Sequence, residues 1–150
     1  MRTVSPAMCQ RSDRCGFVAA HAGGGRRQWS YDHLVEQDLV KFLGAHVAAF
    51  DVIIAADTIC YVGELDAFAH AARRSLADDG LLIFTVEVLT DGAADAPWRL
   101  QPHGRYCHAR EYVETTLADH GFSVRDVRRV VLRREAGRQV DGWLVTAAAS

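Results

Sequence analysis

Apolar residues in the middle of the chain form two unbroken runs separated by an amphipathic segment. The first run, Asp51 to Ala56, reads Asp-Val-Ile-Ile-Ala-Ala, and Leu81 to Val88 is of the same kind. Unbroken runs rich in β-branched residues are typical of strands buried on both faces of a parallel sheet. Between them, Glu64 to Asp79 has the apolar pattern of a helix that Gly80 would end. Residues 50–88 are therefore predicted to form a strand, a helix and a parallel strand.

The pattern after residue 109 predicts a helix followed by a hairpin. Arg110 to His120 has one apolar face, and Gly121 supplies the stop. Two β-rich runs follow, Ser123 to Arg134 and Val140 to Ala148, and Gly137 lies in the short loop between them. We therefore expect the sheet to end in an antiparallel pair.

The first third of the chain has a weaker pattern. Leu34 to Asp38 is a short strand candidate, and Leu39 to Ala45 is predicted to be a brief helix. Residues 9–30 show no clear periodicity and are predicted to be an irregular loop. Gly23-Gly24-Gly25 lies in this loop without a confident strand before it or helix after it, so we do not expect it to bind phosphate. We predict a single domain over residues 1–150.

Composition narrows the class of protein. The chain has 150 residues, a formal net charge of −2, and four cysteines that form no CxxC pair. The nearly balanced charge argues against nucleic acid as a partner, and the absence of an apolar run of about 20 residues argues against a membrane span. We expect a soluble cytoplasmic protein with free thiols.

Acidic residues follow the predicted strands. Asp38, Asp57 and Glu87 each lie at the carboxyl end of a strand, and Tyr61 follows Asp57 closely. In an open parallel α/β sheet, small molecules bind outside these ends. The alternative is that Asp57 caps the turn after its strand and that Tyr61 packs at the rim of the sheet. The pattern alone leaves both interpretations open.

Five segments, taken in order, resemble class I S-adenosylmethionine-dependent methyltransferases. More narrowly, they are similar to the type 11/12 methyltransferase domains that often follow tetratricopeptide repeats in bacteria. The segments read VSPAM (4–8), VEQDLVKFL (35–43), FDVIIAADTICYVGEL (50–65), LLIFTVE (81–87) and GRYCHAREYV (104–113). The resemblance implies an α/β fold with a Rossmann-like methyltransferase sheet, mostly parallel, ending in an antiparallel C-terminal hairpin.

The resemblance also implies roles for individual residues. S-adenosyl-L-methionine is the implied cofactor, with Asp38 near the adenine and the Leu39 backbone beside it. The loop after the strand that ends near residue 56 would close over the methionine part and the methyl group, through Ala55, Ala56, Asp57 and Tyr61. A small-molecule or protein acceptor would meet Arg105 and Tyr106, and the candidates for a catalytic base are Glu87 and His108.

The chain departs from the family at its N-terminus. The Asp-x-Gly-x-Gly-x-Gly turn that approaches the cofactor closely is absent, and Thr3 stands where the ribose-binding acid is expected. We therefore expect a truncated domain that lacks the first strand and the glycine-rich turn. A sheet without that strand would have an open edge, which would favour a homodimer.

Other functions remain as alternatives to a methyltransferase. Loss of the glycine-rich turn would also fit a non-catalytic remnant that acts as a binding or dimerisation module, and a nicotinamide-dependent enzyme is a weaker alternative. We expect no metal site, because His103, Cys107 and His108 have no evident fourth ligand. Cys60 lies in an apolar context, which is typical of an inert packing residue.

Overall fold

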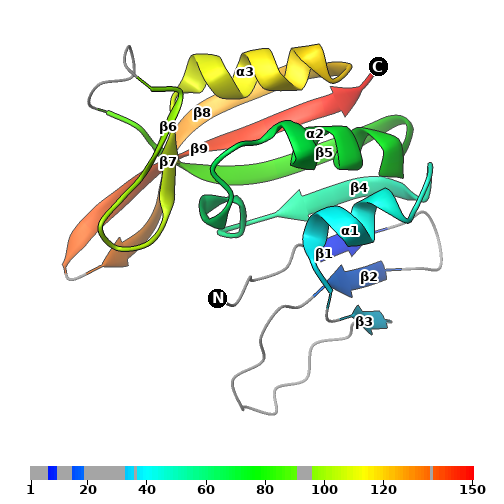
Figure 1. The fold of residues 1–150 in the computed structure, drawn as a ribbon, viewed down its shortest axis with the longest axis horizontal. Helices are drawn as coiled ribbons and strands as arrows, with labels where there is room; N and C mark the ends of the chain where they lie inside the picture. The colour runs from blue at the N-terminus through cyan, green and yellow to red at the C-terminus, as the bar shows by residue number, and fades with distance from the viewer. Residues whose placement is uncertain (1–6, 10–14, 19–32, 36, 91–95, 136) are drawn as a thin grey trace.

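The chain is described by a computed structural model that covers residues 7–9, 15–18, 33–35, 37–90, 96–135 and 137–150. Its strands assemble into one sheet, and the helices pack against it (Figure 1). In chain order the elements are β1 (Ala7–Cys9), β2 (Cys15–Val18), β3 (His33–Val35), α1 (Leu39–Gly44), β4 (Phe50–Ala55), the 3-10 turn η1 (Ile59–Tyr61), α2 (Asp66–Ser75), β5 (Leu76–Val88), β6 (Trp98–Leu100), β7 (Tyr106–His108), α3 (Arg110–Asp119), β8 (Phe122–Glu135) and β9 (Arg138–Ala149).

Strand β5 joins the parts of the sheet. It runs parallel to β4, antiparallel to β9, and parallel to β7 at its carboxyl end. On one side the order continues from β4 through β1 and β2 to β3, and on the other β9 pairs with β8. Antiparallel pairs outnumber parallel ones among the described strands, so the sheet is mixed rather than mostly parallel.

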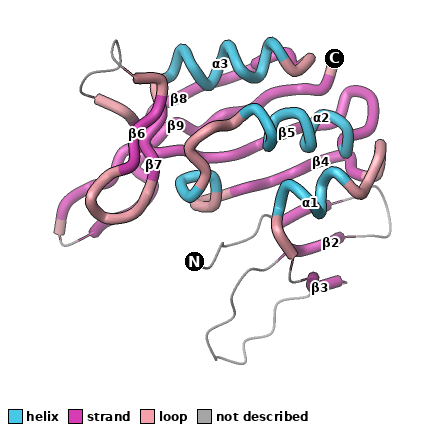
Figure 2. Tube along the Cα trace, in the orientation of Figure 1, coloured by secondary structure: helices cyan, strands magenta, loops and turns pink. Residues whose placement is uncertain are grey.

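The helices α1, α2 and α3 lie next to one another on the same face of the sheet (Figure 2). Their apolar sides meet alternate residues of the strands, because successive side chains of a strand point to opposite faces. Ile53, Leu82 and Phe84 are almost completely buried, and the ring of Phe84 packs edge-on against Phe68 of α2 with centroids 5.7 Å apart. Ile54 points to the other face and is 36% exposed.

The predicted helix before β5 ends four residues earlier than expected. Helix α2 ends at Ser75, and Leu76 already pairs with Phe50 of β4. Asp79 has φ +61°, and the register between β4 and β5 shifts in this region. Gly80 lies inside β5 rather than at the helix end, where an added Cβ would come within 2.9 Å of the Ala77 carbonyl oxygen. Backbone pairing with β4 therefore overrides the helical pattern of Leu76 to Asp79.

The N-terminal segment contains strands that the pattern did not predict. Cys15–Val18 forms β2 inside the predicted loop 9–30, and Cys9 ends β1; the other residues of that loop lie outside the described residues. Strand β1 pairs antiparallel with β4, so the place next to β4 is occupied. The open edges that the sequence predicts are therefore at outer strands such as β3 and β8 of the described sheet and not at β4. The homodimer stays a prediction.

The C-terminal third matches its pattern closely. Helix α3 ends at Asp119, and Gly121 follows with φ +78° as the predicted stop. Strands β8 and β9 form the predicted antiparallel hairpin, and Gly137 in its loop also has φ +78°, a conformation that glycine adopts without strain. The hairpin β6–β7 was not predicted, since its strands have only three residues each.

Candidate functional site

Side chains from distant parts of the chain meet at the carboxyl ends of β4 and β5. We call this group the carboxyl-edge cluster. Its acids follow β4, end β5 and end β8, and its arginines come from the residue before β7 and from β8. The members are Asp57, Tyr61, Glu87, Arg105, Arg133 and Glu135.

Arg133 lies at the centre of the cluster. Its Nη1 donates to Asp57 Oδ1 at 2.9 Å, and its Nη2 donates to Glu87 Oε1 and, at 3.3 Å, to Glu135 Oε2. Glu87 is only 3% exposed, and a buried carboxylate without a cation beside it would be costly. Desolvation opposes the charge of Arg133, yet the hydrogen bond to Glu87 and the charges of Glu87 and Asp57 raise its pKa. Arg133 thereby ties the end of β5 to the loop after β4.

Arg105 joins Tyr61 to the same cluster. Its Nη1 is 3.0 Å from Glu135 Oε2, and its Nε donates to the Tyr61 hydroxyl at 3.4 Å. The guanidinium also lies over the Tyr61 ring, 5.8 Å from the centroid. The hydrogen bond to Tyr61 is the largest of the causes that raise the pKa of Arg105. Desolvation opposes it less strongly, and the charges of Glu135 and Asp57 raise the pKa further. Tyr61 is thus held at the rim by a cation.

The backbone at Asp57 is strained. Its φ is +49°, a left-handed conformation that a non-glycine residue rarely adopts. Its amide donates to Thr85 Oγ1 of β5 at 2.9 Å, which helps to hold the loop in this position. Such conformations cost free energy and gather at ligand-binding and catalytic sites. Asp57 is therefore held by its neighbours, with its side chain half exposed at the edge of the sheet.

The other residues predicted to bind the cofactor make no side-chain contact that is described with the carboxyl-edge cluster. Asp38 is exposed, and its Oδ1 accepts from the Lys41 amide at 3.0 Å as the N-cap of α1. Leu39 is buried in the core. Ala55 ends β4 in the core, and the exposed Ala56 follows it. The structure thus brings together Asp57, Tyr61, Glu87 and Arg105, but none of the described contacts joins Asp38 to them.

His108 and Tyr106 face the interior of the β6–β7 region. His108 is fully buried, its Nε2 lies 2.9 Å from the Gly63 carbonyl oxygen, and its Nδ1 has no hydrogen-bond partner. Burial is the main cause that lowers its pKa, so the neutral ring is favoured. Tyr106 packs against Trp98 and the backbone of Gly63. The catalytic role of His108 and the substrate contact of Tyr106 stay predictions.

Two charged groups of this region were missed in the sequence, and a third group, His103, was considered there as a metal ligand and interpreted as a polar rim or surface residue. Arg133 and Glu135 come from β8, and His103 Nε2 lies 3.6 Å from Glu87 Oε2. The alternation of side chains along β8 indicates the face of the sheet on which Arg133 lies. No local sequence signal indicates which acids it contacts.

The buried thiols near the cluster are poor nucleophiles. Burial, together with the charges of Asp57 and Glu87, raises the pKa of Cys60 to about 12. Burial and Glu87 likewise raise the pKa of Cys107 to about 11. A thiol with such a pKa remains protonated at neutral pH and reacts slowly. Cys60 is therefore the packing residue that its apolar context indicates.

Within residues 7–9, 15–18, 33–35, 37–90, 96–135 and 137–150, no group of three or more His, Cys, Asp or Glu side chains is arranged to hold a metal ion. In the same ranges, no helix has the length and apolar character that crossing a bilayer requires.

Known proteins resemble the chain in fold and not in sequence. No model of a protein family matches it, and no curated protein matches it either. Among solved structures, a SAM-dependent methyltransferase from Methanosarcina mazei superposes with a TM-score of 0.63 at 13% identity, over 85% of this chain and 72% of that one. A putative S-adenosylmethionine-dependent methyltransferase from Listeria monocytogenes gives 0.61 at 18% identity, over 83% and 72%.

A third structure has its ligands bound. The 1,6-didemethyltoxoflavin-N1-methyltransferase of Burkholderia thailandensis, crystallised with 1,6-didemethyltoxoflavin and S-adenosylhomocysteine, superposes with a TM-score of 0.62 at 17% identity, over 81% of this chain and 53% of that one. The chain therefore has the Rossmann-like fold of the class I S-adenosylmethionine-dependent methyltransferases.

Proposed function

We propose that the chain is a methyltransferase domain that uses S-adenosyl-L-methionine and transfers its methyl group to a small-molecule or protein acceptor. The observation that carries this proposal is the carboxyl-edge cluster. It brings Asp57, Tyr61 and Glu87 together at the ends of β4 and β5, where folds of this kind bind small molecules. The Burkholderia thailandensis enzyme, which has this fold, methylates a small molecule.

The charge of the cluster suits a sulfonium ion. Asp57, Glu87 and Glu135 supply three carboxylates against the guanidinium groups of Arg105 and Arg133, which leaves one net negative charge. A positive group near these acids would be stabilised by their charge. The exposed Ala56 beside them has a small side chain, whereas Ala55 is buried in the core. The residues on the β4 and β5 side therefore fit the cofactor.

The protein's own contribution would be alignment and proton transfer. The cofactor supplies an activated methyl group for an in-line displacement. Glu87 is the better placed base for an oxygen or carbon nucleophile, since its Oε1 is held by Arg133 while its Oε2 is 3.6 Å from His103 Nε2. An amine acceptor needs no such base when it reacts in its neutral form. His108 stays the second candidate for the catalytic base, although its ring is fully buried.

A non-catalytic binding module is the second candidate function. Its specific support is the direction of β1, which runs antiparallel to β4. Backbone groups at the end of a parallel central strand normally approach the cofactor closely. In this alternative the cluster would stabilise the fold without binding a nucleoside.

Calorimetric titration with S-adenosylhomocysteine separates the two functions. We expect saturable binding of the wild type, and about tenfold weaker binding of Asp57→Asn, because that change removes a carboxylate that would face the ammonium group of the amino-acid part, which S-adenosylhomocysteine shares with the cofactor. Asp126→Asn on β8, whose acid pairs only with Arg128 at the surface, is the matched control and should bind like the wild type. Absence of binding by the wild type would favour the non-catalytic module. Equal affinities for Asp57→Asn and the control would remove Asp57 from the cofactor site.

A further inference from the structure

The hairpin β6–β7 has two different faces. On one face, Trp98 and Tyr106 pack against each other and against Gly63, where an added Cβ would come within 2.8 Å of Tyr106 and 3.0 Å of Trp98. The other face carries Arg99, Gln101 and Cys107, since residues two apart on a strand share a face and Arg99 pairs with Cys107 in the register. The aromatic face anchors the hairpin, so the polar face is presented in a fixed position.

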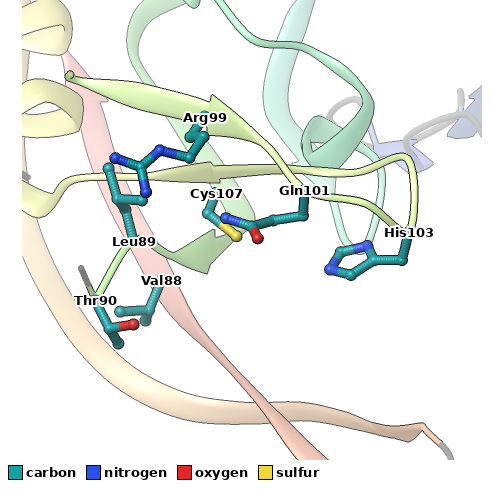
Figure 3. Close-up of a pocket in the computed structure, with 7 residues that line it drawn as sticks. All are labelled: Val88, Leu89, Thr90, Arg99, Gln101, His103 and Cys107. Carbon is teal, nitrogen blue, oxygen red and sulfur yellow. The ribbon is translucent and has the colours of Figure 1, made fainter. Parts of the chain in front are cut away.

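A pocket lies between this polar face and the end of β5. Its volume is about 250 Å³, and Val88, Leu89 and Thr90 line it on the β5 side. Figure 3 shows that the Arg99 side chain extends over Leu89, that the Gln101 amide points toward Cys107, and that His103 stands at the hairpin end of the pocket. Drug-sized ligands occupy roughly 300–1,000 Å³, so this pocket suits a small metabolite or one end of a larger molecule.

The polar lining of the pocket is chemically one-sided. Arg99 offers a guanidinium, Gln101 an amide, and His103 an imidazole, whereas none of the lining residues within the described ranges has a carboxylate. Within the part of the chain that the structure describes, Arg99 forms no ion pair, in contrast to Arg105 and Arg133. A planar guanidinium beside an amide donor matches the two oxygens of a carboxylate or phosphate group. The pocket is therefore suited to an anion.

The pocket also adjoins the proposed base. His103 Nε2 is 3.6 Å from Glu87 Oε2, and the Cys107 Sγ is 3.7 Å from the same oxygen. Both residues line the pocket, so they form the wall between it and Glu87. A molecule anchored at Arg99 would thus have its other end directed toward the carboxyl-edge cluster.

We propose that this pocket binds a carboxylate or phosphate group of the methyl acceptor, so that the acceptor is a small organic acid or a phosphate ester. That the bound molecule is the methyl acceptor rests on the proposed methyltransferase function. The anion site itself stands on the pocket and on Arg99, Gln101 and His103, and it can be tested without turnover. The nearby Glu87 would discourage an anion at its own end, which fixes the orientation of the bound molecule.

The test is a set of NMR titrations of the full ¹⁵N-labelled chain. We expect sodium benzoate to shift the Arg99 Nε–H and the amides of Leu89, Gln101 and Cys107 saturably, while uncharged benzamide leaves them unchanged over the same concentrations. Inorganic phosphate, titrated separately, distinguishes the two anions: tighter binding than benzoate indicates a phosphate ester, and weaker binding an organic acid. Equal responses to benzoate and benzamide, or no response to either benzoate or phosphate, would overturn the proposal.

Variants of Arg99 connect the shifts to the pocket. Arg99→Gln should weaken benzoate binding at least about tenfold, and Arg99→Lys should restore part of it, because the charge returns without the planar fork. Arg134→Gln removes another exposed arginine, on β8, and should bind like the wild type. Equal weakening by Arg99→Gln and Arg134→Gln would overturn the assignment to this pocket. Because Arg99 is exposed, its replacement should leave the thermal unfolding midpoint unchanged, which shows that the variant is folded.

The same samples keep the two proposals separate. Binding of S-adenosylhomocysteine without binding of benzoate or phosphate would leave the proposed function standing and remove the anion site. Binding of benzoate or phosphate at Arg99 without S-adenosylhomocysteine would leave an anion-binding pocket and remove the methyltransferase function.

Discussion

The apolar core beneath α2 and the carboxyl-edge cluster are held together in different ways. In the core, Leu82 and Phe84 of β5 and Phe68 of α2 contact many apolar neighbours, each replaceable by another of similar volume. In the cluster, Glu87 and Arg133 depend on each other, because a buried charge without its partner is costly. The same strand, β5, supplies both regions, with the core along its length and the cluster at its carboxyl end.

The difference separates stability from ligand binding. Truncation in the core should lower the free energy of unfolding and leave the site's polar geometry intact in the molecules that remain folded. A change at Arg133 should affect both properties, since this side chain holds Asp57 and Glu87 together. The variants below test this separation, beginning with the largest effect.

The largest effect is expected in the core. Phe84→Ala should lower the free energy of unfolding by about 3–5 kcal/mol, because it removes a buried ring packed against Phe68 and leaves a cavity. Urea denaturation followed by circular dichroism measures this loss. Ile54→Ala, on the neighbouring strand but facing the partly exposed side of the sheet, should cost less than about 1.5 kcal/mol. Similar losses for both variants would contradict the one-sided core.

A smaller effect on stability is expected at Arg133. Arg133→Met should lower the free energy of unfolding by about 2 kcal/mol, because it leaves Glu87 buried without its cation. Arg133→Met should also weaken the binding of S-adenosylhomocysteine, because Asp57 would lose its hydrogen bond from Arg133. A core truncation should not have this effect.

Arg129→Met is the control for that variant. Arg129 pairs with Asp141 at the surface, with an Nη2 to Oδ2 distance of 2.7 Å, and an exposed pair contributes about 1 kcal/mol or less. If the two arginine variants have the same stability and the same ligand affinity, Arg133 does not organise the cluster.

The smallest effect is a pH dependence at His108. Burial lowers the pKa of this ring below its usual 6.5, so below that pH the unfolded chain binds a proton that the folded chain excludes. Stability attributable to His108 is therefore complete above pH 6.5 and falls as the pH drops, by at most about 1.4 kcal/mol per pH unit. His108→Gln should reduce the stability difference between pH 7.5 and pH 5.5 in urea denaturation. His70→Gln, on the exposed side of α2, should keep the full difference.

Much of the fold follows from the sequence pattern, and the exceptions have physical causes. The strands and helices of two segments were predicted because their core positions repeat at helical or strand spacing. These segments are Phe50 to Val88 and Arg110 to Ala148. The end of α2 was misplaced since Leu76 satisfies a helical pattern and also pairs with Phe50. Strand β2 was missed because Cys15–Val18 owes its structure to backbone pairing with β1, which no local pattern records.

The candidate site was predictable in position more than in composition. Asp57, Tyr61 and Glu87 were found because parallel strands bring their carboxyl ends to one edge. Arg133 and Glu135 were not, since their contacts with Asp57, Glu87 and Arg105 depend on the register of β8 against β9. The catalytic role of Glu87 stays a prediction. So do the roles in binding the cofactor that the resemblance implies for Asp38, Leu39, Ala55, Ala56, Asp57 and Tyr61.

The outer strand β8 has a consequence for how copies of this protein meet. Among the described strands it pairs only with β9, which leaves its other side without a backbone partner. Its register shifts at Val124/Asp126 and Val131/Arg133 interrupt the regular ladder, and exposed arginines such as Arg125, Arg128 and Arg134 lie along it. Irregular, positively charged margins repel identical margins. Polymerisation through strand addition is therefore discouraged at β8, even when the protein is crowded.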